Sequence, residues 1–179
     1  MNLSTPSSEA DETYKEAAAT HSAALSRLAH AYEAEPAKRA DLLQEIHIAI
    51  WKSLGGFNRA CSLRTWVFRV AHNVGASHVL RERRMNRVRM VGLEELDAAL
   101  GAPDSLQAVA EQQALARLTN LIRQLIPIDR QVILAYLEGM DAEAISGLTG
   151  LSASNVATKV HRIKEILRKR FEARDFDGQ

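Results

Sequence analysis

The sequence predicts an all-α fold, with two small helical domains joined by an acidic linker and a helix-turn-helix in the C-terminal domain. Apolar residues recur at steps of three or four along most of the 179 residues, which is the period of helices that bury one face. No segment shows the alternation of apolar and polar residues that is typical of half-buried strands. Alanine, leucine and arginine, which favour helices, are frequent, whereas aromatic residues make up 5% of the chain.

Start and stop signals set the predicted boundaries. Pro36 either ends the first helix or begins the second, and Gly55–Gly56 stops the second. Ser62, Asp129, Asp141 and Ser152 are predicted N-caps. Helices are expected over about 12–34, 41–54, 62–90, 115–125, 129–137, 141–149 and 152–173, with room for a short one over 93–100. The predicted division is a polar tail at 1–12, a first domain at 13–90, a linker at 91–110 and a second domain at 111–175.

Charge is segregated along the chain, although the net charge is only +1. Residues 61–90 carry seven basic and one acidic side chain, and residues 159–179 carry seven and four. The stretch between them, 91–158, carries three basic and nine acidic side chains. Two basic blocks separated by an acidic stretch indicate an extended polyanion contacted at two places. The alternative is a pair of solvated helix faces.

Residues 141–168 have the pattern of a helix-turn-helix. Ser146 supplies a small residue where the helices approach, Gly150 can take the left-handed turn conformation, and Val156 can lock the second helix. Ser146 stands where alanine is more usual. A structural helical hairpin is the alternative for this segment.

The second helix of this motif carries a polar stripe opposite its apolar one. The N-terminal residues of such a helix reach base edges in the major groove. Asn155 can pair with adenine, Thr158 with thymine, and Arg162 and Lys159 with guanine or phosphate, while His161 and Lys164 flank them. A capping role is the alternative for Asn155.

The first basic block is expected to form a long helix with cations and nearby aromatic residues. Such a helix can bind a duplex backbone and stack unpaired bases. Trp66 and Phe68 are also candidates for the core. The preceding loop, "GGFNRACS", is short and polar and could form a pocket for a flipped base.

Other classes of function find little support in the sequence. One cysteine, Cys61, excludes an internal disulfide and fits a reducing compartment. An enzyme using Cys61 with His72 or His78 would lack an orienting third group, and no metal-ligand spacing or phosphate-binding glycine loop is present. We expect no catalytic residue, no metal and no cofactor. No apolar run long enough to span a membrane and no leader are found, so a cytoplasmic protein without membrane insertion is expected.

Two motif sets resemble the extracytoplasmic-function (ECF) group of bacterial RNA polymerase sigma factors. The first is "DLLQE" at 41–45 with Trp51, "LRTW" at 63–66 and "RVAHN" at 69–73. The second is "LIPIDRQVILAYLEGMDAEAISGLTGLSASNVATKVHRIKEIL" at 125–167. The resemblance covers about residues 14–174 and implies a factor that directs core polymerase to promoters by reading the −35 and −10 elements and that aids DNA melting. A dimeric helix-turn-helix repressor is the rival interpretation.

The resemblance also implies the role of individual residues. Docking on the polymerase clamp is implied for Asp41, Leu42, Gln44, Glu45, Ile48 and Trp51, although Leu42 and Trp51 are also core candidates. Contact with the melted −10 element is implied for Phe57, Asn58, Arg59, Leu63, Arg64, Asn73, Arg81 and Arg84. Contact with the −35 element is implied for Ser154, Asn155, Ala157, Thr158, Lys159, His161, Arg162 and Lys164.

The partners implied by the resemblance are promoter DNA, the clamp and flap of core polymerase, and an anti-sigma factor. Two positions depart from the pattern of the group. Ser77 stands where members commonly carry aspartate, and "SNV" at 154–156 replaces Gly-Thr-Val. A promoter sequence therefore cannot be transferred from a relative.

Overall fold

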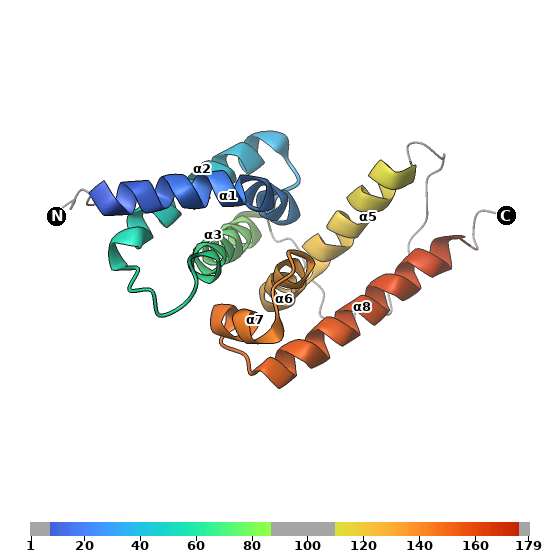
Figure 1. The fold of residues 1–179 in the computed structure, drawn as a ribbon. Coiled ribbons are helices and arrows are strands. Elements are labelled where there is room, and N and C mark those ends of the chain that lie inside the picture. Colours follow the sequence, from blue (N-terminus) through green and yellow to red (C-terminus); the bar gives the residue numbers. More distant parts are fainter. Residues whose placement is uncertain (1–7, 87–109, 176–179) are drawn as a thin grey trace.

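The structure is a computed structural model that describes residues 8–86 and 110–175. Within these ranges the regular structure is helical and contains no β-strand, which confirms the predicted all-α class. Figure 1 shows the helices of the first half on one side and those of the second half on the other. The elements are α1 (Ser8–Tyr32), α2 (Pro36–Ser53), the 3₁₀ turn η1 (Leu54–Gly56), α3 (Leu63–Asn86), α5 (Ala110–Gln124), α6 (Pro127–Leu137), α7 (Ala142–Thr149) and α8 (Ala153–Asp175).

Four helix starts differ from those expected, among them the start of α5, which lies at Ala110 and not near residue 115. Helix α1 begins at Ser8, inside the predicted tail, and α2 begins at Pro36, whose fixed φ suits the first turn of a helix. Helix α6 begins at Pro127 after Ile126, so the prediction that Asp129 is its N-cap is wrong. Asp129 lies in the first turn and is buried. The predicted linker and its short helix fall largely outside the described residues.

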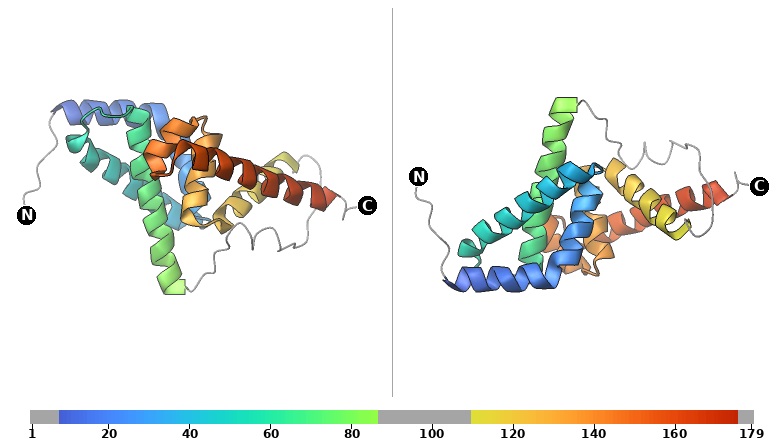
Figure 2. Two further views of the ribbon diagram at one scale, coloured as in Figure 1. Left: turned by 90° about the horizontal axis from the view of Figure 1, so that it is seen from below. Right: turned by 90° about the horizontal axis from the view of Figure 1, so that it is seen from above.

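The first domain is a three-helix unit in which α1, α2 and α3 all pack on one another. Their apolar stripes meet in a core that includes Leu28, Leu42, Ile46, Ile50 and Phe68, each no more than 3% exposed. Burying one such side chain contributes roughly 1.5–3 kcal/mol. In the two views of Figure 2, α3 crosses this unit and extends beyond it.

The second domain is built on α6, with α7 and α8 packed against it and against each other, and α5 leads into it. Ile122, Leu125, Ile133 and Ile163 join α5, α6 and α8 in a cluster of buried apolar residues. This packing fixes the direction of α8, the longest helix of the domain.

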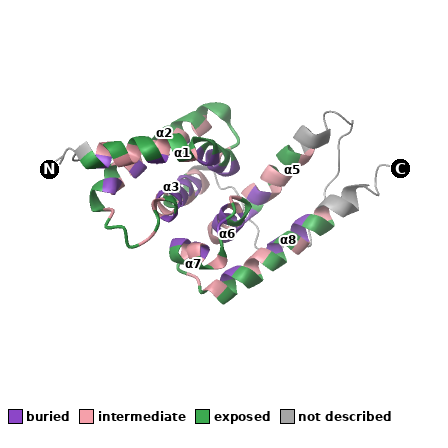
Figure 3. Ribbon diagram, viewed as in Figure 1, coloured by how far each residue is buried: buried purple, intermediate pink, exposed green. Residues whose placement is uncertain are grey.

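The two domains share a core. Helix α3 contacts α6 and α7, and α1 contacts α5, so buried residues of α3 and α7 belong to one apolar cluster. Figure 3 shows buried residues on α3, α6 and α7, which lie next to one another. In this structure the domains are therefore closed on each other.

Tyr32, at the end of α1, lies where the two domains meet and contacts residues of both. Its hydroxyl is 3.1 Å from Nδ1 of His72, and the guanidinium of Arg130 from α6 lies 5.1 Å from its ring centroid. A Cβ on Gly75 would meet the ring at 2.7 Å, so the close approach of α3 to Tyr32 requires a glycine there. Burial raises the pKa of Tyr32 and lowers the pKa of Arg130 to about 10.

Candidate nucleic-acid interface

The turn between α7 and α8 has the predicted chemistry. The Asp141 carboxylate accepts a hydrogen bond from the Ala144 amide at 2.8 Å and caps α7. Gly150 ends the helix with φ of 76°, and its amide donates to the Ser146 carbonyl at 2.8 Å. A positive φ is costly for other residues, which explains the glycine.

Helix α8 begins just after Ser152. The Ser152 hydroxyl accepts a hydrogen bond from the Asn155 amide at 3.3 Å. The cap is therefore Ser152, as predicted, and the side chain of Asn155 is exposed. Val156 is 1% exposed and holds α8 on the domain core.

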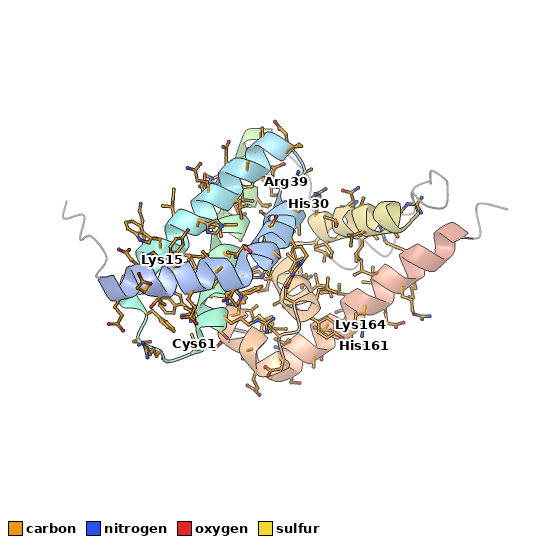
Figure 4. The ribbon with its side chains drawn as sticks, turned by 45° about the horizontal axis from the view of Figure 1, so that its top comes forward. Lys15, His30, Arg39, Cys61, His161 and Lys164 are labelled. Atoms are coloured by element: carbon orange, nitrogen blue, oxygen red, sulfur yellow. The ribbon has the colours of Figure 1, made fainter. Side chains whose placement is uncertain are left out.

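The outer face of α8 presents most of the polar stripe to solvent. Figure 4 shows two of its members, His161 and Lys164, close together on α8. The Lys164 ammonium also lies 5.3 Å from the Tyr136 ring centroid and 3.3 Å from its hydroxyl. The exposed members are Ser154, Asn155, Ala157, Thr158, His161, Arg162 and Lys164.

Lys159 is the exception on this helix. It is half-buried, and its ammonium lies 2.6 Å from the carboxylate of Asp129, whose side chain is 2% exposed. A buried carboxylate needs such a partner. Lys159 therefore holds α8 against α6 in this structure, a role that was not predicted from the sequence.

In the first domain, the loop before α3 is held in a defined shape. The Asn58 side chain accepts a hydrogen bond from the Ala60 amide at 3.1 Å, and Arg59 has φ of 59°. Phe57 packs against Trp66 with ring centroids 5.3 Å apart. Asn58 and Arg59 are exposed, whereas Phe57 is half-buried.

The aromatic residues of α3 belong mainly to the core. Phe68 is 1% exposed, so it is a core residue, which was the alternative prediction for it. Trp66 is half-buried, and its indole donates to the Ser53 hydroxyl at 2.9 Å. Arg69 lies 4.7 Å from the Trp66 ring centroid, so this ring has a cation on one face.

The predicted −10 residues of α3 fall into two groups. Leu63 is half-buried, while Asn73 and Arg84 are exposed. Arg64 and Arg81 are exposed as well, but they already have partners. Arg64 donates to the backbone carbonyl of Glu138, at the end of α6. Arg81 pairs with Glu45 of α2 at 2.7 Å, which joins two residues predicted for different surfaces.

Helix α2 carries the predicted polymerase-docking residues on its outer side, with one exception. Asp41, Gln44 and Glu45 are exposed, and Ile48 is 44% exposed. Leu42 is 1% exposed, so it is a core residue, which was the alternative prediction for it. Trp51 is half-buried, and its indole donates to the Asp11 carboxylate at 2.8 Å.

A surface cavity of about 530 Å³ lies between α1 and α2 beside these residues. Tyr14 and His47 form part of its wall, and the Tyr14 hydroxyl is 3.1 Å from the His47 ring. The α1 side of this cavity was not predicted from the sequence. No local signal marks it, because residues about 33 positions apart meet there only through helix packing. The lining residues are Asp11, Tyr14, Lys15, Gln44, His47, Ile48 and Trp51.

The groups considered for catalysis have structural partners. His72 is fully buried beside Tyr32, and burial lowers its pKa from 6.5 to about 3. His78 lies 2.8 Å from Glu33, and among the described residues no hydrogen bond joins Cys61 to either histidine. Nor do the described residues gather three or more side chains that could hold a metal ion. Within 8–86 and 110–175, no helix is both long and apolar enough to cross a bilayer.

These features define a helical DNA-binding protein of the helix-turn-helix class, with an exposed polar face on the second helix of the motif. Comparison with known proteins narrows the class. The family model for sigma-70 region 2 matches residues 18–85, and that for sigma-70 region 4 matches residues 115–167. The chain therefore belongs to the sigma-70 family of RNA polymerase sigma factors and is of the ECF type.

Individual relatives agree with this assignment. RNA polymerase sigma factor CnrH of Cupriavidus metallidurans is 28% identical over 156 residues, which cover 82% of this chain and 80% of CnrH. The ECF RNA polymerase sigma factor SigX of Bacillus subtilis is 28% identical over 136 residues, covering 74% and 70%. A solved structure of CnrH in complex with the cytosolic domain of CnrY matches the fold with a TM-score of 0.63 at 22% identity, covering 89% of this chain and 88% of that one.

The family gives the function at the level of the whole protein. Sigma factors of this kind are non-catalytic proteins that act in promoter recognition at transcription initiation. Regions 2 and 4 follow each other in the order that the two motif sets predicted. A free-standing repressor would not require the region 2 match, so the sigma interpretation replaces that rival.

Proposed function

We propose that α8 reads the −35 element and that the 57–63 loop with α3 engages the melted −10 element. The observation that carries this proposal is the exposed polar face of α8, placed directly after a capped left-handed turn. Asn155, Thr158 and Arg162 lie on the first turns of the helix, and in a helix-turn-helix these turns enter the major groove. Lys159 is tied to Asp129, so its contribution is to hold the helix in position.

The −35 assignment is tested by Arg162→Ala, with Lys52→Ala as the control. Lys52 is an exposed cation on α2, outside the proposed DNA faces. Loss of one good base contact costs roughly 1–3 kcal/mol, so promoter binding by the polymerase complex should weaken about 5- to 150-fold for Arg162→Ala. The Lys52 variant should bind as the parent does. Equal affinity of the two variants would show that Arg162 is not on the reading face.

We propose further that the outer face of α2 docks on the clamp of core polymerase. Asp41, Gln44 and Ile48 are exposed and can make this contact, and Trp51 borders the adjoining cavity. Glu45 is exposed as well, but it would have to exchange its partner Arg81 for the polymerase surface. Leu42 is excluded from direct contact because it is buried. The exposed side chains offer hydrogen-bond acceptors, one amide and one apolar anchor to a partner surface.

The remaining partners follow from the same assignment. The second domain contacts the polymerase flap, as the resemblance implies. An anti-sigma factor covers the working surfaces, and the complex of CnrH with the cytosolic domain of CnrY supports a partner of this kind. The protein performs no catalysis of its own and acts in the cytoplasm with polymerase. Transcription with core polymerase on genomic DNA, followed by mapping of start sites, tests the whole assignment, because a factor of this kind must produce discrete new starts.

A further inference from the structure

One side of α3 faces away from the core of the first domain along most of the helix. Its members follow one another at steps of three or four residues, so they lie on the same side of the helix. They form the outer stripe, which consists of Trp66, Arg69, Asn73, Ser77, Leu80 and Arg84. The first two are half-buried and the other four are exposed. Figure 2 shows that the far part of α3 extends beyond the other helices of the first domain.

Leu80 is the exposed apolar member of the outer stripe. Its side chain is 47% exposed, whereas the adjacent Val79 is 8% exposed and belongs to the core. Among the side chains of α3 that the structure describes, 63–84, no other large apolar one is exposed. A single exposed leucine is common on protein surfaces, so its surroundings decide whether it has a partner.

Two ion pairs to α2 fix the direction in which Leu80 points. Arg81 pairs with Glu45 at 2.7 Å, and Glu82 pairs with Lys38 at 3.1 Å. Residues two apart on a helix are rotated by about 200° from each other. Because Glu82 reaches towards α2, Leu80 lies on the side of α3 that is turned away from α2.

Trp66, the other large apolar member of the outer stripe, is already covered. Phe57 packs against it with ring centroids 5.3 Å apart, and the Arg69 guanidinium lies 4.7 Å from its ring centroid. Its indole N–H donates to the Ser53 hydroxyl at 2.9 Å. Leu80 is therefore the apolar surface of the outer stripe that is open to a partner.

The charge of α3 indicates what kind of partner this is. Residues 61–90 carry seven basic and one acidic side chain, and the acidic one, Glu82, pairs with Lys38. Arg84 is exposed one turn beyond Leu80. Such a surface attracts a polyanion. Phosphates and sugars offer little to a leucine, whereas apolar side chains do pack against bases. In a paired duplex the neighbouring bases cover each base face, so a face becomes open to a side chain when the base is unstacked.

We propose that Leu80 packs against the face of an unpaired base in single-stranded DNA. The proposal rests on the function proposed above, because it takes the contact between α3 and the melted −10 element from there. It adds a residue to that contact, since Leu80 is not among the −10 residues that the resemblance implies. Arg84 contacts the phosphates beside this base, and Leu80 makes the contact that requires the base itself.

The two kinds of contact predict different responses to removal of the bases. Leu80→Ala should weaken binding to a single strand that carries bases about 3- to 15-fold, because it removes most of the apolar surface that the base would cover. Binding to a strand of abasic sites, which has the same phosphates, should stay unchanged in this variant. Arg84→Ala should weaken binding to both strands by a similar factor.

The experiment measures fluorescence anisotropy of the full chain, without polymerase, on two labelled strands of equal length. One is single-stranded DNA of mixed sequence, and the other consists of abasic sites. Leu80→Met keeps an apolar side chain of similar volume and should bind both strands as the parent does. Leu115→Ala is the matched control, because Leu115 is a 65% exposed leucine on α5, outside the proposed DNA faces. Circular dichroism verifies that all variants keep their helical content.

The measured quantity is the ratio of the two affinities. The parent, Leu80→Met and Leu115→Ala should prefer the strand with bases, and Leu80→Ala should lose most of this preference. The proposal is overturned if Leu80→Ala keeps the preference of the parent, if it weakens binding to both strands equally, or if the parent has no preference. Failure of the parent to direct core polymerase to any promoter would instead refute the proposed function, because the preference for bases is measured without polymerase.

Discussion

Gly150 and Gly147 offer a sharp test of the helix-turn-helix, because they lie three residues apart and should respond to alanine in opposite directions. Gly150 has φ of 76°, whereas Gly147 lies within α7. At either position a Cβ would meet no side chain or backbone of another element within 4 Å. A steric clash is therefore excluded in both variants. Only the backbone conformation distinguishes them.

The expected energies follow from that difference. A left-handed conformation costs a residue with a Cβ roughly 1–2 kcal/mol, so Gly150→Ala should be destabilised by about that amount. Alanine is favoured over glycine inside a helix by roughly 0.8–1.0 kcal/mol, so Gly147→Ala should be stabilised. The two variants should differ by about 2–3 kcal/mol in free energy of unfolding.

Urea unfolding followed by circular dichroism measures both values in the same way. Gly150→Ala should also weaken −35 binding, because strain at the turn alters the angle at which α8 leaves α7. Equal stabilities of the two variants, or a more stable Gly150→Ala, would refute the assignment of the turn. A destabilised Gly147→Ala would refute the reasoning about the helix.

Three further predictions concern the domain junction and the docking surface. Gly75→Ala should lower the free energy of unfolding by roughly 1–3 kcal/mol, because the added Cβ would lie 2.7 Å from the Tyr32 ring and overpack the junction. A higher Tm for this variant would contradict the close packing. The double variant Asp41→Ala, Gln44→Ala should bind core polymerase about tenfold more weakly, while its helical content stays unchanged. If the double variant binds core polymerase as well as the parent does, these residues of α2 do not dock on the polymerase. Burial lowers the pKa of His72 from 6.5 to about 3, so between these two pH values His72 is protonated in the unfolded chain but not in the folded protein. The free energy of unfolding should therefore decrease as the pH falls through this range, by up to about 1.4 kcal/mol per pH unit. In urea unfolding measured across this pH range, His72→Gln should remove this contribution to the pH dependence of stability. An unchanged pH dependence would show that another group causes it.

Helix α8 and the turn before it show how far local sequence determines the structure of this protein. Asp141, Gly150 and Ser152 occupy the capping and turn positions predicted for them. These features depend on contacts within four residues, so the relevant partners are visible in the sequence. Val156, which was predicted to lock the second helix, is buried as well.

The site residues were predictable only in part. Asp129 was predicted to cap a helix, and Lys159 to contact DNA, but the fold joins the two in an ion pair at 2.6 Å. Leu42 stood among the docking residues, yet the packing of three helices buries it. A helical period shows that a stripe is apolar, but it does not show which polar residue another element will cover.

The sequence by itself determined the all-α class, the order of the two regions and the chemistry of the turn, because each arises from patterns within a few residues. Only the tertiary structure decided that the domains close on each other and that Arg27 and Arg64 meet at Glu138, 111 and 74 positions away. Contacts over such distances have no period and no motif. They arise where the packing of whole helices brings a donor and an acceptor together.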